Sequence, residues 1–195
     1  MTADKSPSPG RLVIISGPSG AGKSTVVRGI LEKSQLPLKL SVSATTRAPR
    51  PGETDRLDYH FITRDEFARR REAGDFLEWK EVHSRGDWYG TLRKTVEEGL
   101  TAGLWVVLEI DVEGTLSVLD DYPSAITIFI HSGSVEELER RLRHRATENE
   151  ENLQLRLAAA KRELEFKDKY KYKVINHDRD TAVREVCEIL NREAR

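Results

Sequence analysis

The chain has 195 residues, of which 37% are hydrophobic and 33% are charged, and its formal net charge is −1. This length suits one domain with small inserted lobes and a substantial buried core. The near-zero net charge argues against a protein that coats nucleic acid. No apolar run approaches the roughly 20 residues of a membrane-spanning helix, and the first residues, MTADKSPSPGR, lack an apolar signal segment. We therefore expect a cytoplasmic globular protein with neither nucleic acid nor membrane as a partner.

The stretch SPSPG within residues 1–10 predicts a flexible tail. A strand is expected over residues 11–16, and the segment after it reads GPSGAGKST. A Gly-x4-Gly-Lys-Ser spacing after an apolar strand is typical of a phosphate-binding loop, because its glycines let backbone N–H groups surround phosphate oxygens. We expect Lys23 to reach the β- and γ-phosphates of a nucleotide and Ser24 to ligate Mg2+. The expected phosphate-binding residues are Gly17, Pro18, Ser19, Gly20, Ala21, Gly22, Lys23, Ser24 and Thr25.

The rest of the core alternates apolar strand segments with helical patterns. Further strands are expected over residues 38–43, 104–110, 125–130 and 171–176, and helices over 22–33, 91–103, 134–145, 150–167 and 180–192. This alternation predicts an α/β fold, a P-loop NTPase core with a parallel sheet flanked by helices. In such a sheet, ligands bind at the carboxyl ends of the strands. The single cysteine, Cys187, lies in the last helix, where we expect a core thiol rather than a nucleophile.

Residues 44–90 interrupt the alternation with a segment rich in proline, glycine and charge, followed by short alternating strands around DYHFI and FLEWKEV. We expect an inserted mixed α/β lobe that binds a second substrate; an insertion without function is the alternative. Arg47 and Arg50 lie three positions apart beside a proline-stiffened turn, where two guanidinium groups could clamp one phosphate. Tyr59 and Tyr89 could add phenolic donors to that phosphate, although each alone could be structural.

Eight motifs in the chain resemble those of guanylate kinases and occur in the same order: GPSGAGKST, SVSATTRAPRPGE, DYHF, FLEW, WYGT, LEIDVEG, ERRLRHRATE and LQLRLAAAKREL. The similarity extends from about Arg11 to about Leu190. It implies ATP-dependent phosphorylation of GMP to GDP, a step of purine nucleotide metabolism. It also implies a single domain with three parts, namely a core of residues 11–43, 91–140 and 168–192, a GMP-binding lobe of residues 44–90, and a mobile helical lid of about residues 141–167.

The resemblance implies a set of GMP-binding residues, carried over position by position: Ser43, Arg47, Arg50, Tyr59, Glu78, Tyr89, Thr91 and Asp111. Ser43 and Glu78 would read guanine. The chemistry of the base agrees, because N1–H and the 2-amino group suit a bidentate carboxylate and O6 accepts from a hydroxyl. The arginines and tyrosines would hold the phosphate, and Thr91 would donate to the base or position the turn. Asp111 would help to order the base or the neighbouring arginines; capping of the following helix is the alternative.

The sequence departs from the family pattern in three places. Tyr89 follows Glu78 by eleven positions, about two more than is usual, and Trp88 stands where the family usually has tyrosine. A longer hairpin tip could hold the extra residues without moving either end. Glu109 stands where aspartate is more common, and we expect it near Mg2+, with a water molecule between them.

In the lid, Arg141, Arg145 and Arg156 match family arginines that approach the phosphates of ATP. Positioned arginines stabilise the charge of the transition state more than that of the ground state. With Lys23 and Arg47, these three residues form the expected catalytic set. Asn176 matches a position beside the adenine of ATP, with a loop-capping role as the alternative. The GMP phosphate is already an anion, so no general base is needed.

Two other functions fit the sequence less well than an active guanylate kinase does. A related kinase with a different acceptor is disfavoured by Ser43 and Glu78, which suit guanine. The peptide-binding guanylate-kinase-like modules of scaffolding proteins typically lose phosphate-loop or lid residues, which this chain has. The expected ligands are ATP with Mg2+, GMP and dGMP. The sequence does not distinguish a monomer from a homo-oligomer.

Overall fold

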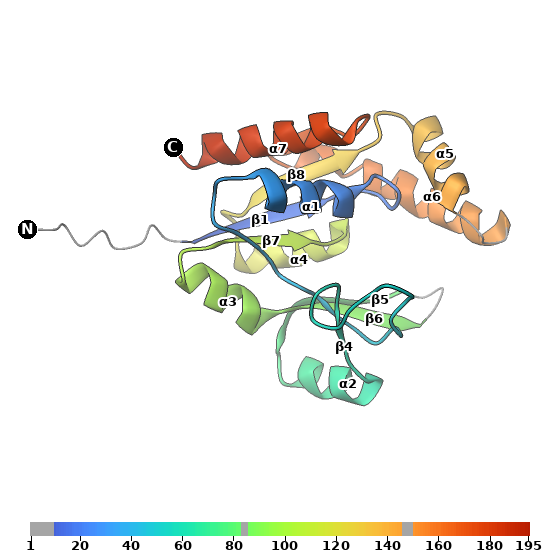
Figure 1. The fold of residues 1–195 in the computed structure, drawn as a ribbon. Coiled ribbons are helices and arrows are strands. Elements are labelled where there is room, and N and C mark those ends of the chain that lie inside the picture. Colours follow the sequence, from blue (N-terminus) through green and yellow to red (C-terminus); the bar gives the residue numbers. More distant parts are fainter. Residues whose placement is uncertain (1–9, 83–85, 146–149) are drawn as a thin grey trace, which may run out of the picture. The chain divides into compact units, whose positions relative to one another are not determined.

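A computed structural model describes residues 10–82, 86–145 and 150–195, without the side chains of residues 144, 145, 151 and 152 (Figure 1). The chain divides into two compact units. The first unit comprises Met1–Leu12, Leu38–Leu108 and Glu113–Ala125, and the second comprises Val13–Pro37, Glu109–Val112 and Ile126–Arg195. Apart from Gly10, the expected tail lies outside the described residues. No helix in the described ranges combines the length and the apolar character needed to cross a membrane.

The second unit is built on parallel strands in the order β1-β8-β9, namely β1 (Arg11–Ser16), β8 (Ile126–His131) and β9 (Tyr172–Ile175). Helices α1 (Lys23–Lys33) and α7 (Arg179–Glu193) pack against each other. Helices α5 (Val135–Arg145) and α6 (Glu150–Leu164) form a separate pair (Figure 1). The apolar cluster between α5 and α6 consists of Leu138, Leu142, Leu153, Leu157 and Ala160.

The first unit contains two groups of strands. Its parallel pair is β2 (Leu38–Leu40) with β7 (Trp105–Glu109). A mixed sheet has the order β4-β3-β6-β5 and consists of β3 (Ala44–Thr45), β4 (His60–Phe61), β5 (Phe76–Val82) and β6 (Asp87–Leu92). The helices of this unit are α2 (Arg64–Glu72), α3 (Arg93–Thr101) and α4 (Val112–Asp121).

The α/β fold with a parallel sheet flanked by helices, expected from the sequence, is confirmed. The expected core strands correspond to β1, β2, β7, β8 and β9, and the expected helices to α1, α3, α5, α6 and α7. The apolar runs of β1, β7 and β8 become buried strands because both faces of a parallel sheet are covered. The last lid helix is shorter than expected, since α6 ends at Leu164 and a 3-10 turn, η1 (Lys167–Lys169), follows.

The sequence patterns predict neither α4 nor α2, and α2 lacks the usual signal of a helix. Its sequence, RDEFARRRE, has one buried residue, Phe67, and therefore no apolar stripe. Phe67 stacks on Phe76 with ring centroids 4.4 Å apart. Thr63 caps the helix, because its hydroxyl accepts the backbone N–H of Glu66 at 3.1 Å. Capping and aromatic contacts of Phe67 with Phe76 and Trp88 thus take the place of amphipathic periodicity.

Arg56 has a backbone conformation that is unusual for its residue type. Its φ of 65° is the one positive value at a non-glycine residue in the described ranges. The backbone N–H of Arg56 donates to the carbonyl oxygen of Tyr59 at 2.7 Å, which closes the loop before β4. A left-handed conformation brings Cβ close to the following carbonyl, and the cost is about 1–2 kcal/mol.

We expect Arg56→Gly to raise the free energy of unfolding by up to about 1 kcal/mol, because glycine removes the Cβ clash but adds entropy to the unfolded chain. Arg56→Ala is the matched control, since it removes the exposed guanidinium and keeps Cβ. Urea unfolding of the three proteins measures the difference. Equal stability of the Gly and Ala variants would contradict the assignment of strain to this backbone.

Candidate active site

The phosphate loop of the second unit leaves β1 at a glycine and ends at the first turn of α1. Gly17 has a φ of 137°, and a Cβ at this position would lie 2.0 Å from the carbonyl oxygen of Ile130. Gly22 has a φ of 87°, and its Cβ would lie 2.4 Å from Nδ2 of Asn176. A larger residue at Gly17 would displace the end of β8, and one at Gly22 would displace the side-chain amide of Asn176. The glycines of the motif are therefore required by packing as well as by backbone conformation.

The ammonium group of Lys23 folds back over the loop. It donates to the carbonyl oxygens of Gly17 at 2.6 Å and Pro18 at 3.2 Å. The hydroxyl of Ser24 donates to Oε1 of Glu109 at 2.5 Å. A pocket of about 170 Å3 lies over these groups, lined by Ser19, Gly20, Gly22, Lys23, Ser24, Thr25 and Glu109. A hydroxyl and a carboxylate are oxygen ligands of the kind that Mg2+ prefers, so this pair fits the expected metal.

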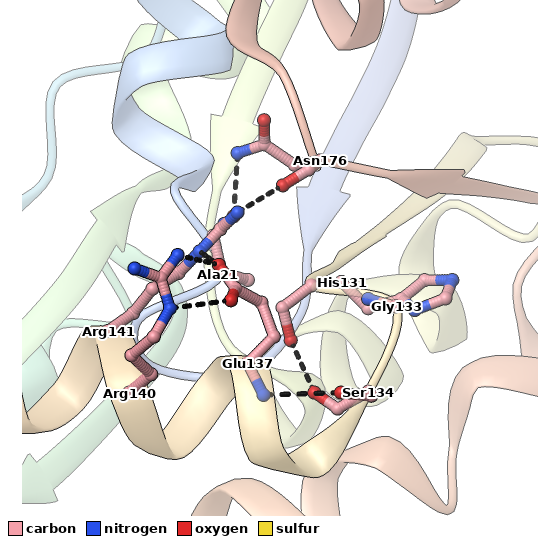
Figure 2. Close-up of polar contacts among 9 residues, drawn as sticks. Ala21, His131, Gly133, Ser134, Glu137, Arg140, Arg141 and Asn176 are labelled. Carbon is pink, nitrogen blue, oxygen red and sulfur yellow. Dashed lines mark hydrogen bonds and ion pairs between the residues drawn. The ribbon is translucent and has the colours of Figure 1, made fainter.

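Figure 2 shows how α5 places Arg141 beside the loop after β9. Nε of Arg141 donates to Glu137 at 2.6 Å, and Nη2 donates to the backbone carbonyl oxygen of Asn176 at 2.7 Å. Arg140 also pairs with Glu137 at 2.8 Å, and the two arginines hold the pKa of this carboxyl at about 2. Arg140 itself is exposed, as expected from the sequence. Glu137 thus orients Arg141, an arginine of the lid, beside the segment that follows β9.

Asn176 connects the end of β9 to the phosphate loop. Its buried side-chain amide donates to the carbonyl oxygen of Ala21 at 2.8 Å. Its backbone N–H donates to the carbonyl oxygen of His131, at the carboxyl end of β8, at 2.7 Å. These contacts support the loop-capping alternative, while the expected place beside adenine stays a prediction.

Helix α6 approaches the phosphate loop at Ser19. Nη2 of Arg156 donates to the hydroxyl of Ser19 at 3.1 Å, and the backbone N–H of Ser19 donates to the carboxylate of Glu163 at 3.3 Å. Arg145 is the last residue of α5, and its side chain lies outside the described part of the chain. Asp111 belongs to the second unit and is half-buried. The expected roles of these residues remain predictions.

In the first unit, Arg47 has contacts on three sides. Its Nη1 and Nη2 atoms donate to the two carboxylate oxygens of Glu53 at 2.8 and 2.9 Å, and Nη1 also donates to the carbonyl oxygen of Ala48 at 2.8 Å. Nε donates to the hydroxyl of Tyr89 at 3.2 Å. The guanidinium carbon lies 5.3 Å from the ring centroid of Tyr59. Arg47 is 9% exposed, whereas the side chain of Arg50 is exposed.

Glu78, the carboxylate expected to read the base, lies on β5 of the mixed sheet. Glu78 and Thr91 are opposite each other in the antiparallel pairing of β5 and β6, and the hydroxyl of Thr91 donates to Oε1 of Glu78 at 2.6 Å. Ser43 directly precedes β3, and its carbonyl oxygen accepts from the backbone N–H of His60. The β5–β6 ladder continues to the pair Val82 and Asp87, so much of the connection between Glu78 and Tyr89 is paired strand. The tip, residues 83–85, lies outside the described residues.

Three acidic residues with contacts to these groups were not identified from the sequence: Glu53, Glu137 and Glu163. Glu137 could have been found, because an acid three and four positions before two arginines on a helix faces both. Glu53 follows Arg50 by three positions in a proline- and glycine-containing turn, which indicates a turn but not a partner for Arg47. Glu163 meets Ser19 across 144 positions of sequence, and no local pattern signals that contact.

A glycine-rich loop between a parallel strand and a helix, with a lysine and a serine at its end, defines a phosphate-loop nucleotide-binding protein. The family model described as guanylate kinase matches residues 9–193. The chain therefore belongs to the guanylate kinase family, phosphotransferases that use ATP to phosphorylate GMP. The resemblance of the sequence motifs to this family is confirmed.

Curated relatives match almost the whole chain. The guanylate kinase of Rhodopirellula baltica is 56% identical over 190 residues, which cover 97% of this chain and 91% of the relative. The guanylate kinase of Rubrobacter xylanophilus is 48% identical over 183 residues, 94% of both chains. Among solved structures, guanylate kinase from Anaplasma phagocytophilum is 33% identical with a TM-score of 0.77, covering 95% of this chain and 87% of that one.

We expect the Arg47–Glu53 pair to stabilise the fold in a pH-dependent way. The Arg47 guanidinium and the N–H of Arg50 lower the pKa of Glu53 from 4.5 to about 2. A carboxyl whose pKa is lower in the folded state contributes stability above its unfolded pKa and loses it as the pH falls through the folded pKa. Glu53→Gln should therefore lower the free energy of unfolding by about 1–2 kcal/mol at neutral pH. The value is modest because the pair is partly exposed and water screens it. The cost should shrink between pH 4.5 and about 2.

Urea unfolding from neutral to acidic pH measures this difference, with Glu72→Gln, an exposed glutamate of α2, as the control. A destabilisation by Glu53→Gln that stays constant across the acidic range would contradict the assigned role of the ionised pair.

Proposed function

We propose that the two units divide the guanylate kinase reaction between them, with the phosphates of ATP on the loop of the second unit and GMP on the mixed sheet of the first. One observation carries the acceptor assignment. Tyr89, which accepts from Arg47, and Thr91, which donates to Glu78, are two positions apart on β6 and therefore point to the same face of the sheet. That face thus has the guanidinium of Arg47, which could bind a phosphate, next to the carboxylate of Glu78, which could bind the edge of a base.

The proposed role of Glu78 follows from the donors of guanine. Its carboxylate would accept from N1–H and the 2-amino group, while Ser43 would donate to O6. Thr91 holds one carboxylate oxygen of Glu78 at 2.6 Å, which restricts the rotation of the group. Adenine would bring a lone pair at N1 against the carboxylate, so the site favours guanine. We propose Asp111 as a further residue of the GMP side.

On the ATP side, we propose that the loop N–H groups and Lys23 hold the β- and γ-phosphates. Lys23 donates to the neutral carbonyl oxygens of Gly17 and Pro18, and a phosphate oxygen would replace these two acceptors with a gain in attraction. When bound, Mg2+ neutralises phosphate charge and orients the transferred group. Ser24 and, with a water molecule between, Glu109 are the residues that would hold the metal. Arg141, Arg145 and Arg156 would complete the shell of positive charge around the phosphates, and Asn176 would approach the adenine.

The proposed chemistry is positioning and charge stabilisation without a general base. The GMP phosphate is an anion at neutral pH and attacks in line, while negative charge spreads over the transferred group. Cationic side chains that bind this spread charge more tightly than the ground state accelerate the step. None of the residues assigned to GMP is assigned to the ribose 2′-hydroxyl, so we also propose dGMP as an acceptor. We propose the cytoplasm, which contains ATP and GMP, as the location.

We expect Lys23→Ala to lower the turnover number by about 100-fold or more, because an aligned positive charge at the transferred phosphoryl group is lost. The far-UV circular dichroism spectrum should not change, since the ammonium contacts loop carbonyls rather than the core. Lys39→Ala, which removes an exposed lysine of β2, is the control and should retain turnover. A coupled assay of ADP formation from ATP and GMP provides the measurement. Full turnover of the Lys23 variant would refute the role of the loop.

We expect Glu78→Gln to lower kcat/KM for GMP by roughly one to several powers of ten, because each lost charged hydrogen bond costs about 1.5–3 kcal/mol. Activity with AMP should change much less, so the preference for GMP should narrow. Glu81→Gln is the matched control, because Glu81 is on the same strand but three positions away, on the opposite face. If GMP efficiency stays within about twofold, a difference near 0.4 kcal/mol, Glu78 does not read guanine.

A further inference from the structure

The fork of Arg47, expected to clamp a phosphate, is already occupied by a carboxylate of the chain. Both Nη atoms donate to Glu53, and Nη1 gives its second hydrogen to the carbonyl oxygen of Ala48. A guanidinium group has two edges that can form paired hydrogen bonds, one with Nη1 and Nη2 and one with Nε and Nη2. Glu53 takes the first edge. The second edge faces the hydroxyl of Tyr89, to which Nε donates at 3.2 Å.

The carboxylate of Glu53 is itself fixed by a turn. The backbone N–H of Glu53 donates to the carbonyl oxygen of Arg50 at 3.0 Å, and the backbone N–H of Arg50 donates to the carboxylate of Glu53 at 2.7 Å. These reciprocal contacts tie the side chain to its own backbone. The rings of Tyr59 and Phe61, with centroids 5.3 and 5.7 Å from the guanidinium carbon, restrict Arg47 from the side. The orientation of the guanidinium is therefore determined on its edge and on its face.

We propose that Glu53 is a positioning residue for the acceptor phosphate: it holds the Nη1–Nη2 edge of Arg47 and so presents the Nε–Nη2 edge, beside the hydroxyl of Tyr89, to the phosphate of GMP. This inference rests on the proposed binding of GMP to the first unit. The phosphate then replaces the Tyr89 hydroxyl as the acceptor of Nε–H and takes two parallel hydrogen bonds from Arg47, and the released Tyr89 hydroxyl donates to the same phosphate, while Glu53 keeps its own pair. The ionised pair also raises the pKa of Arg47, so the guanidinium stays charged.

In the opposite function, Glu53 would compete with the phosphate of GMP for Arg47 and would be displaced when GMP binds. That exchange would leave Glu53 next to a doubly charged anion with its partner lost, and would break a bidentate charged pair together with the turn contact to Arg50. The two functions predict opposite signs for a mutation. Removal of a positioning residue weakens GMP binding, whereas removal of a competitor strengthens it.

The test compares binding of GMP with binding of guanosine, which has the same base and sugar but no phosphate. Isothermal titration of the full chain gives both dissociation constants for the wild type, Glu53→Gln and Glu53→Asp. We expect Glu53→Gln to raise the dissociation constant for GMP by about 10- to 100-fold, the range known for residues that orient metal ligands. The constant for guanosine should not change. Glu53→Asp, which keeps the charge on a shorter side chain, should lie between the wild type and Glu53→Gln.

The control is Glu66→Gln, which removes the carboxylate of another arginine pair, Glu66 with Arg70, in the same unit. It should leave both dissociation constants unchanged. Tighter GMP binding by Glu53→Gln, or GMP binding equal to that of the wild type, overturns the proposal. Equal weakening for GMP and guanosine also overturns it, since that pattern reports a disturbed lobe. If Glu53→Gln does not fold, the same comparison with Glu53→Asp decides.

Failure of the underlying function is seen separately, in the wild type. If the wild-type chain does not bind GMP more tightly than guanosine, the first unit does not hold the phosphate and the proposed function fails. If the wild type binds GMP more tightly than guanosine and Glu53→Gln keeps the same preference, only the proposed role of Glu53 fails.

Discussion

A positively charged side chain in a partly buried site needs an oxygen partner, because an unpaired charge is costly to remove from water. Three of the cationic groups assigned to phosphate binding meet this requirement within the chain, two of them in the second unit and one in the first. Lys23 donates to carbonyl oxygens of its own loop, Arg141 to Glu137 and the loop after β9, and Arg47 to Glu53. The shapes of both candidate sites depend on these pairs.

The chemical nature of each partner determines what a nucleotide can replace. The carbonyl oxygens bound by Lys23 are neutral, and a phosphate oxygen outcompetes them because a charged acceptor makes a stronger hydrogen bond. The partner of Arg47 is a carboxylate bound at both oxygens, which a phosphate displaces only at the cost of an ion pair. Under the proposals above, the same rule describes a lysine that changes partners and an arginine that keeps its partner and binds through its other edge.

The lobe shows how functional geometry depends on contacts that are weak in local sequence signals. Helix α2 has one buried residue, and its position depends on Phe67 stacking on Phe76 and on the cap at Thr63. The loop before β4 contains Arg56 in a left-handed conformation and leads to Tyr59, whose ring faces Arg47. A polar, proline-rich segment lacks the apolar periodicity from which helices and strands are inferred, so its internal structure was only partly predictable.

The sequence alone determined the phosphate loop, the α/β alternation and the family, because each is encoded locally: glycines and a lysine at fixed spacing, apolar runs of strand length, and motifs in a fixed order. The contacts of Arg47 and Glu78 could not be read in this way. Tyr89 meets Arg47 across 42 positions and Thr91 meets Glu78 across 13 positions, so strand register decides both contacts. Glu53 is near Arg47 in sequence, yet the turn at Arg50 aims its carboxylate. Only the tertiary structure could select these partners, because hydrogen bonds depend on distance and direction in space.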